Sequence, residues 1–439
     1  MWKRVTLCAI ILSALLLDGQ AGESQGAVES SYRPGAVLVQ YRSRLDRESL
    51  LSAWDARVEA EIAPLRVLSL RVPAGREAAT VVALRRDPRV AFAGLDYVAS
   101  AADGFTPNDP GWTQQWGPQQ IGAPLAWSVT VGNTATVIAV VDSGVTLSHP
   151  DLVDRLWVNA GEIPANGLDD DGNGQADDVW GWHFYHWWDG QAYAPGENNL
   201  VIDDLGHGTH VAGIAGATVN NGVGIAGIAG GCRLMAVKVL DQYGVGWYSD
   251  IAAGIVYAVD NGARIVNLSL GGSSPSEALQ ASVDYAHARG VLVVAAAGND
   301  GGAVLYPAAC QHALAVAATD RDDQHPSFSN HGPEVDVAAP GVDIYSTWPW
   351  RDGYFTKSGT SMAAPHVAGL AALIWSQHPD YTPDQVQQCI TQTALDVGPP
   401  GWDEYAGWGR IDAGRAVVPH RVLLPLVCHG YYPSWWPAQ

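Results

Sequence analysis

The sequence is poor in positive charge. Among its 439 residues, 24 are lysine or arginine and 45 are aspartate or glutamate, so the net charge is −21. Lysine occurs only at Lys3, Lys238 and Lys357. A protein that binds nucleic acid needs a basic surface to meet the phosphates. The composition therefore excludes nucleic acid as a partner.

Long hydrophobic runs are also missing. The N-terminal run Val5–Leu17 has 13 residues, short of the about 20 that a helix needs to cross a bilayer, and no other segment approaches that length. It follows Lys3 and Arg4 and precedes the small-x-small sequence Gly19-Gln20-Ala21, a pattern typical of a cleaved secretory signal. We expect residues 1–21 to be a signal peptide, the protein to be secreted, and no membrane span. The alternative is an uncleaved membrane anchor.

Charged residues are scarce as well, at 16% of the chain against 47% hydrophobic residues. A disordered chain shows the reverse balance. The 49 glycines and 26 prolines follow no G-X-Y period, which excludes collagen. We therefore expect globular domains, and more than one, because domains usually contain about 100–200 residues.

Cysteine is rare, with five in the chain, and Cys8 lies in the signal. The other four are Cys232, Cys310, Cys389 and Cys428. In an exported protein, four cysteines can form two disulfides with three possible connectivities. There is no CxxC spacing, so zinc is not indicated.

The acidic excess is confined to one part of the chain. Residues 22–105 hold eleven basic and eleven acidic residues, whereas residues 106–439 hold eleven basic and 33 acidic residues. The segment 99–110 between them is rich in small and turn-forming residues, as linkers are. We place a domain boundary near residue 105.

The first part alternates strand-like and helix-like patterns. Strands are expected at 36–41, 66–72 and 90–97, and helices at 48–58 and 76–86. The pattern predicts a small α+β domain.

The second part contains continuous apolar, β-branched runs at 134–141, 263–270 and 291–297. Such runs are typical of strands buried on both faces of a parallel sheet. Helix-like segments separate them, at 207–217, 249–260, 276–289 and 361–377. We predict an α/β three-layer sandwich with a mostly parallel central sheet, whose ligands meet the carboxyl ends of the strands.

Two polar motifs lie near the expected carboxyl ends of the strands, where a ligand would bind. Asp142 ends a buried strand. Considered alone, an acid at this position is more simply explained as a cap or turn residue. His207 opens a helix within Gly206-His207-Gly208-Thr209-His210. A metal site on His207 and His210 is an alternative, but the glutamate of HExxH is absent. A structural histidine is another alternative.

Two further motifs complete the set. Ser361 lies in a small-residue turn that runs into an apolar helix, so backbone N–H groups and the positive end of the helix dipole would face an anion formed there. Alone, it reads as an N-cap. Asn299 follows another buried strand, where its amide can donate to an oxyanion.

The order Asp142, His207, Asn299, Ser361 resembles the subtilisin-like serine peptidases, the subtilase family, over residues 107–417. The resemblance implies peptide hydrolysis through an acyl-enzyme, with Ser361 as nucleophile, His207 as base and Asp142 orienting the imidazole. Asn299 and the Ser361 N–H would hold the oxyanion. A sedolisin-like enzyme would use a glutamate as the base, whereas this sequence has His207. The rival is a catalytically silent binding protein on the same scaffold, and a third option is a metal-dependent hydrolase.

Residues 34–98 resemble the family's N-terminal propeptide, an intramolecular chaperone and inhibitor removed by self-cleavage. The expected domains are a signal peptide (1–21), a propeptide with linker (22–105), a peptidase domain (106–417) and a C-terminal tail (418–439). We expect the maturation cut between residues 100 and 108. The expected partners are polypeptide substrates and the protein's own propeptide, which acts as a transient inhibitor. The protein itself is expected to be a monomer.

The substrate groove follows from the same resemblance. Ser269, Leu270 and Gly271 resemble the family's substrate-binding strand, to which a peptide adds by backbone hydrogen bonds. Val245 and Gly246 resemble the opposite rail. The alternative for the glycines is an ordinary tight turn.

Nearby side chains are expected to shape the pockets. Trp247 and Tyr248 either line a distal pocket or belong to an exposed patch or the core. Leu305 is expected near the base of the primary pocket.

Calcium is the expected metal. Asp169, Asp171 and Asn173 match the first half of a calcium loop, D-x-D-x-N-G, with Asp177 or Asp178 in place of the closing glutamate. The alternative is a solvated acidic loop.

Family correspondence suggests a second calcium site, which would stabilise the fold without doing chemistry. Its ligands would be the side chains of Asp109, Asp151 and Asn221 and the carbonyls of Thr218, Val223 and Ile225.

The tail combines an apolar run with several aromatic residues. Packing on the domain, docking a partner and anchoring at a surface all remain open.

Overall fold

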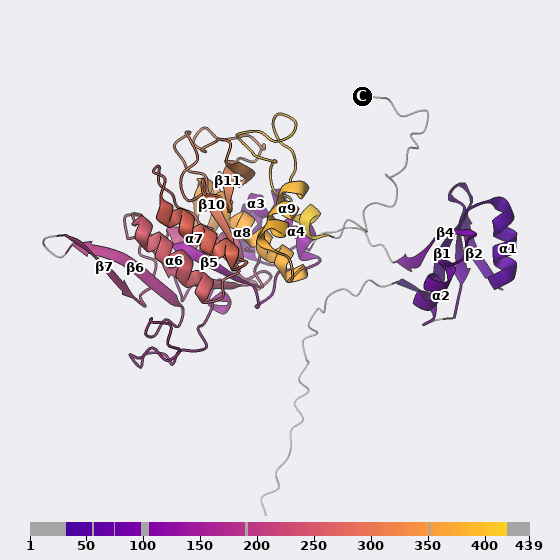
Figure 1. The fold of residues 1–439 in the computed structure, drawn as a ribbon, viewed down its shortest axis with the longest axis horizontal. Helices are drawn as coiled ribbons and strands as arrows, with labels where there is room; N and C mark the ends of the chain where they lie inside the picture. The colour runs from indigo at the N-terminus through magenta and orange to yellow at the C-terminus, as the bar shows by residue number, and fades with distance from the viewer. Residues whose placement is uncertain are drawn as a thin grey trace, which may run out of the picture. The chain divides into compact units, whose positions relative to one another are not determined.

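The computed structural model describes residues 32–54, 57–73, 75–97, 105–188, 192–350 and 353–418. The chain folds as two compact units, one within residues 1–101 and one within residues 102–439 (Figure 1). In the described part of the chain, no helix is both long and apolar enough to span a membrane. The predicted signal peptide and most of the predicted tail lie outside the described residues.

The N-terminal unit is a four-stranded antiparallel sheet with two helices. Its sheet order is β2-β3-β1-β4. Alternate apolar residues of β1 and β3 pack with both helices into one core. The expected α+β architecture is confirmed. The elements are β1 (Tyr32–Tyr41), α1 (Arg44–Trp54), β2 (Arg57–Ile62), β3 (Val67–Arg71), α2 (Glu77–Leu84) and β4 (Val90–Tyr97).

The strand β2 was not predicted, and the helix expected at 48–58 is wrong in its last residues. The helix α1 ends at Trp54 and β2 begins at Arg57. The segment Arg57–Ile62 alternates polar and apolar residues with period two, which suits an edge strand with one face in water. That short alternation was concealed by the helical spacing that precedes it.

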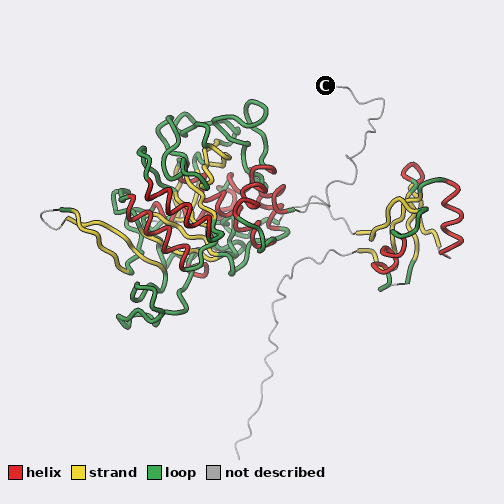
Figure 2. Tube along the Cα trace, viewed as in Figure 1, coloured by secondary structure: helices red, strands yellow, loops and turns green. Residues whose placement is uncertain are grey.

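The C-terminal unit is built on an eight-stranded sheet in the order β12-β11-β10-β9-β5-β8-β6-β7. All its pairs are parallel except β6 with β7. Figure 2 shows these strands between layers of helix. The strands are β5 (Val137–Asp142), β6 (Gly181–Trp188), β7 (Tyr193–Asn198), β8 (Arg233–Lys238), β9 (Ile265–Leu268), β10 (Leu292–Ala296), β11 (Ala313–Thr319) and β12 (Val335–Pro340).

Helices cover both faces of this sheet. On β5, Ile138 and Val140 face the core that contains α8, whereas Ala139 and Val141 face the core that contains α6 and α7. The three-layer α/β sandwich is therefore confirmed. The helices are α3 (Trp116–Gln120), α4 (Ala123–Trp127), α5 (His207–Gly216), α6 (Tyr248–Asp260), α7 (Glu277–Ala288), α8 (Thr360–Gln377), α9 (Pro383–Thr393) and α10 (Ala413–Val417), and a separate hairpin is formed by β13 (Ile344–Thr347) and β14 (Tyr354–Lys357).

The order of the sheet determines where a ligand can bind. Strand β5 lies between β8 and β9, so the chain leaves β5 on one side and later returns to its other side. In open α/β sheets, ligands bind at the carboxyl ends of the strands where the order reverses. Asp142 ends β5, Ser269 follows β9 and Asn299 follows β10, so all three lie along this edge.

The sequence left open whether the four cysteines form two disulfides, and in the structure they do not. Cys232, Cys310 and Cys389 are free thiols in the structure. Two bridges among four cysteines would have to join at least two of these three. Burial raises the pKa of Cys232 and of Cys310 to about 11, so both thiols are protonated and behave as small apolar side chains. Cys428 lies outside the described residues.

His366 makes the stability of this unit depend on pH. It is buried in α8, where its Nδ1 donates to the Met362 carbonyl at 2.8 Å and its Nε2 has no protein partner. Burial lowers its pKa to about 4, against about 6.5 in an unfolded chain. Its contribution to stability is present above pH 6.5 and is lost as the pH falls toward 4. The size of that loss is up to roughly 3 kcal/mol.

We therefore expect His366→Gln to lose less unfolding free energy than the parent between pH 7 and pH 4.5. Urea unfolding in a Ser361→Ala background, which prevents self-digestion, measures the difference. The exposed His378→Gln is the matched control and should follow the parent. Parallel curves for the parent and His366→Gln would contradict the prediction.

Candidate active site

Asp142 and His207 meet where β5 ends and α5 begins. The Nδ1 of His207 donates to Asp142 Oδ1 at 2.8 Å, and the Ser143 N–H donates to the same oxygen at 2.7 Å. The other carboxylate oxygen, Oδ2, is buried and has no protein partner. A buried carboxylate with one unpaired oxygen favours a positive charge on its neighbour.

The pKa of His207 is the outcome of opposing effects. Burial alone would lower it, but the charge of Asp142 and the hydrogen bond to it act in the other direction and raise the pKa overall. Lys357 weakly opposes this rise. The site therefore stabilises a protonated imidazole, the form that a general base becomes when it takes a proton.

Asp203 holds the start of α5 in place. Its carboxylate accepts hydrogen bonds from the backbone N–H groups of Gly206 at 2.7 Å and Thr209 at 2.8 Å, and from the Ser143 hydroxyl at 2.8 Å. It links the end of β5 to the first turn of the helix. The sequence analysis missed this residue, although an aspartate shortly before a helix start is a recognisable capping signal.

Ser361 lies in the first turn of α8. Its hydroxyl donates to the Ser269 carbonyl at 3.0 Å, and the Ser269 hydroxyl donates to the Ser361 carbonyl at 2.8 Å. Among the described residues, Ser361 makes no hydrogen bond to His207. Catalytic hydrogen bonds are often long in free enzymes and tighten when substrate binds. His207 and Ser269 line the same cavity, so the serine and the imidazole belong to one site.

The side chain of Asn299 is oriented by Thr360, which precedes the serine. Asn299 Oδ1 accepts from the Thr360 N–H at 2.8 Å and from its hydroxyl at 3.1 Å. With the oxygen engaged, the amide nitrogen is the group left to donate beside Ser361. Nothing in the sequence distinguished Thr360 from any other small residue of the turn.

The five predicted groove residues come together around one cavity. It has a volume of about 300 Å³ and also contains His207 and Tyr248. Leu305 lies against Gly271, since a Cβ there would approach Leu305 Cβ to 2.9 Å. The predicted residues among its lining are Val245, Gly246, Ser269, Leu270 and Gly271.

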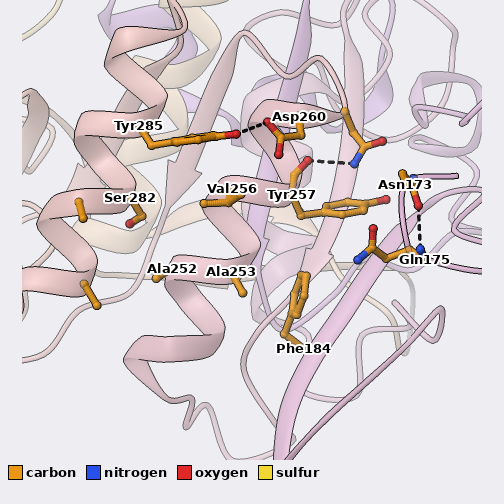
Figure 3. A pocket seen from close by; sticks show the side chains of 13 residues that line it. Asn173, Gln175, Phe184, Ala252, Ala253, Val256, Tyr257, Asp260, Ser282 and Tyr285 are labelled. Carbon is orange, nitrogen blue, oxygen red and sulfur yellow. Dashed lines mark hydrogen bonds between the residues drawn. The ribbon is translucent and has the colours of Figure 1, made fainter.

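A larger hollow of about 610 Å³ lies elsewhere, between α6 and α7 (Figure 3). Its walls carry small side chains such as Ala252 and Ala253, with Phe184 and Tyr257 at one end (Figure 3). None of Asp142, His207, Asn299 or Ser361 lines it. Size alone would therefore not identify the reactive centre.

The predicted calcium loop is only partly assembled as expected. Asp171 approaches Glu162 and Asp178, with one oxygen of each within 4.8 Å of the others. Asn173 Nδ2 donates to Asp178 at 3.1 Å. Asp169 instead accepts from loop N–H groups, including that of Gly172 at 2.8 Å. Glu162 was missed because it precedes the loop and is brought to it by the fold.

The second predicted set also converges. Asp151 accepts from the Ile225 N–H at 2.8 Å and from Asn221 Nδ2 at 2.9 Å, while Asp109 accepts from the Asn221 N–H at 3.2 Å. The Thr218 N–H donates to the Asp151 carbonyl, and the Val223 N–H donates to Asn221 Oδ1. Burial, with a smaller contribution from the charge of Asp109, raises the pKa of Asp151 to about 6.

Both clusters offer the oxygen ligands that calcium prefers. Among the described residues, no lysine or arginine forms an ion pair with Glu162, Asp171, Asp178, Asp109 or Asp151. Their charges are therefore without a protein counter-ion, which fits a cation. Asn221 turns its nitrogen toward Asp151, and this amide would have to rotate to present oxygen to a metal.

Comparisons with known proteins agree with this geometry. The model of the subtilase family, Peptidase S8, matches residues 133–409, and that of the fervidolysin N-terminal prodomain matches residues 19–96. A thermophilic serine proteinase of Bacillus sp. (strain AK1) is 39% identical over 89% of this chain and 89% of its own length. Thermitase of Thermoactinomyces vulgaris is 44% identical over 71% of this chain and 99% of its own length. The halolysin-like extracellular serine protease Nep of Natrialba magadii is 41% identical over 71% of this chain and 53% of its own length.

The chain therefore belongs to the subtilase family. It is a subtilisin-like serine protease that carries an N-terminal prodomain. The silent binding protein and the metal-dependent hydrolase are not favoured.

The contact between Asp142 and His207 depends on a glycine. A Cβ at Gly208 would overlap the Gly144 carbonyl oxygen and approach Asp142 Cβ to 3.2 Å. Since backbone cannot move aside cheaply, we expect Gly208→Ala to displace the pair. A misplacement of about 1 Å can lower kcat by about 100-fold. Hydrolysis of a chromogenic peptide measures the loss.

Gly302→Ala is the matched control, because a Cβ there meets nothing within 4 Å. Circular dichroism verifies that both variants are folded. A folded Gly208→Ala enzyme with parental kcat would contradict the prediction.

Proposed function

We propose that this chain is an endopeptidase in which Asp142, His207 and Ser361 form the catalytic triad. His207 takes the proton of the Ser361 hydroxyl as Oγ attacks the substrate carbonyl, and later gives it to the leaving amine. Asp142 holds the imidazole and stabilises its charged form. The observation that carries the proposal is the 2.8 Å hydrogen bond from His207 to Asp142 beside the groove.

Asn299 and the Ser361 N–H would stabilise the tetrahedral oxyanion. The bonds from Thr360 to Asn299 Oδ1 support this role, since they hold the amide before the charge develops. Donors fixed in advance need no reorganisation during the reaction. The substrate would add as a strand between Val245–Gly246 and Ser269–Gly271, with Leu305 near its primary pocket.

We further propose that the protein is a secreted zymogen, with a signal peptide at 1–21 and a propeptide at 22–105. The peptidase domain, 106–417, would release itself by cutting between residues 100 and 108. The match to a prodomain over residues 19–96 supports this order of parts. A relative that is named extracellular supports secretion. Until its removal, the prodomain would inhibit the enzyme.

Calcium would stabilise the folded peptidase domain and take no part in the chemistry. The carboxylates of Glu162, Asp171 and Asp178 would hold one ion, and those of Asp109 and Asp151 another. Their support is the gathering of oxygen ligands without a protein counter-ion.

The nucleophile can be tested through maturation. We expect the purified wild type to lose roughly 80 residues beyond the signal and Ser361→Ala to keep them, because removing the serine lowers kcat by roughly 10⁶-fold. Intact mass spectrometry of both proteins, with peptide hydrolysis beside it, measures the outcome.

Adding wild-type enzyme to Ser361→Ala is the control. Cutting in trans would show that the bond is accessible and that the variant lacks only its nucleophile. Undiminished hydrolysis by Ser361→Ala would exclude the proposed mechanism.

Calcium should act on stability first and on activity only as a consequence. A ligand that binds only the folded form at about 100 times its Kd stabilises it by about 2.7 kcal/mol. We expect calcium to raise the thermal midpoint, and Glu162→Gln and Asp151→Asn each to weaken that rise. Scanning calorimetry with calcium and with a chelator measures it.

Asp154→Asn removes an exposed carboxylate outside both clusters and should keep the full response. An immediate loss of activity at low temperature on adding chelator would contradict a structural role. An unchanged midpoint would exclude calcium at both clusters.

A further inference from the structure

The groove of this enzyme continues onto an aromatic surface that the sequence analysis did not assemble. We name the side chains of Trp247, Tyr193 and His186 the aromatic shelf. The Trp247 ring centroid lies 5.3 Å from that of Tyr193 and 5.5 Å from that of His186. Trp247 is 47% exposed and Tyr193 58% exposed, so a large part of each side chain is open to solvent.

Two of the three shelf residues, His186 and Tyr193, lie on the β6–β7 hairpin, which extends away from the rest of the peptidase domain (Figure 1), and Trp247 directly precedes α6. His186 lies on β6 and donates from Nδ1 to Asp250 Oδ2, at 2.9 Å, in the first turn of α6. This bond joins the hairpin to the helix that follows Trp247. The rings are therefore positioned by a packed polar contact rather than by an open loop.

The shelf is directly continuous with the groove. Val245, Gly246 and Tyr248 line the groove, and Trp247 stands between them. Trp247 has extended backbone, with φ −94° and ψ 145°, and successive side chains of an extended segment point to opposite sides. Tyr248 therefore faces the cavity and Trp247 faces the hairpin. A peptide bound along this rail can reach the shelf once it extends past Tyr248.

The negative charge of the peptidase domain indicates which kind of substrate side chain would bind to the shelf. Residues 106–439 contain eleven basic and 33 acidic residues, a net charge of −22. Such a field attracts cations and repels acidic side chains. An open shelf buries little of an aliphatic side chain, whereas a planar guanidinium stacks on an exposed indole or phenol ring.

We propose that the aromatic shelf is an extended subsite that selects a basic residue, arginine above all, in the part of the substrate upstream of the groove. This inference rests on the proposed function, because it assumes that the acyl side of the substrate lies between the two rails.

The test compares peptides that differ at one position. Each has the same cleaved sequence, preceded by an extension that carries Arg, Leu or Glu five, six or seven residues before the cleaved bond. A short peptide without the extension reports on basal hydrolysis. At the best position, kcat/KM for Arg should exceed that for Leu by about three-fold, the size of an exposed cation–π contact. Glu should be the poorest, and added salt should narrow the range.

Variants then locate the preference. Trp247→Ala should bring the Arg-to-Leu ratio close to one, and Tyr193→Ala should reduce it independently if Trp247→Ala does not fold. Trp187→Ala is the matched control. Trp187 is also on β6 and 51% exposed, but it points to the opposite face from His186, so the ratio and the basal hydrolysis should stay as in the parent.

Two results would overturn the proposal: a wild type that cleaves the Leu peptide as well as the Arg peptide, or an Arg preference that survives in both shelf variants. Failure of the proposed function looks different, because the short peptide would then also resist cleavage by the wild type.

Discussion

The close approach of two backbones, at the end of β5 and the start of α5, is the constraint on which the site depends. Gly208 lies so near the Gly144 carbonyl that no side chain fits between them, and this closeness brings His207 Nδ1 to 2.8 Å from Asp142. Other groups hold the junction from its sides. Asp203 ties Ser143 to the first turn of α5, and the buried Lys238 Nζ donates to the Ser143 carbonyl at 2.6 Å. The pair is thus fixed by backbone and by buried polar bonds, with little freedom left to the side chains.

The layers of the fold bring the other half of the site to this junction. Helix α8 is buried along most of its length, so its N-terminus is held by packing on both the sheet and α5. Ser361 is then placed by its reciprocal hydrogen bonds with Ser269, which follows β9 beside β5. A rigid core of this kind can hold a reactive group to the accuracy that catalysis needs. The groove lies along the same edge, because both of its rails follow strands of the sheet.

The sequence predicted those parts of the site that are encoded locally. Asp142, His207, Asn299 and Ser361 each stand in a short motif at the end of a strand or the start of a helix, and the structure places them along one edge. Glu162 could not be predicted, because its approach to Asp171 and Asp178 depends on how a loop folds back. The sequence also could not show whether Trp247 or Tyr248 faces the groove, since both side chains are aromatic. The edge strand β2 was not predicted, because the helical pattern that precedes it continues into its first residues.

The shortage of lysine and arginine has a structural consequence that links the two acidic clusters. The buried basic groups are already engaged, Lys238 with Asp204 at 2.8 Å and Arg410 with Asp323 at 2.7 Å. Among the described residues, no lysine or arginine forms an ion pair with Asp151, whose pKa burial raises to about 6, or with the carboxylates around Asp171. Buried charges without a partner are destabilising unless a counter-ion is supplied. In a chain with so few cations of its own, the calcium that we propose would supply a counter-charge for both loops, and the same negative field would favour basic side chains in the substrate.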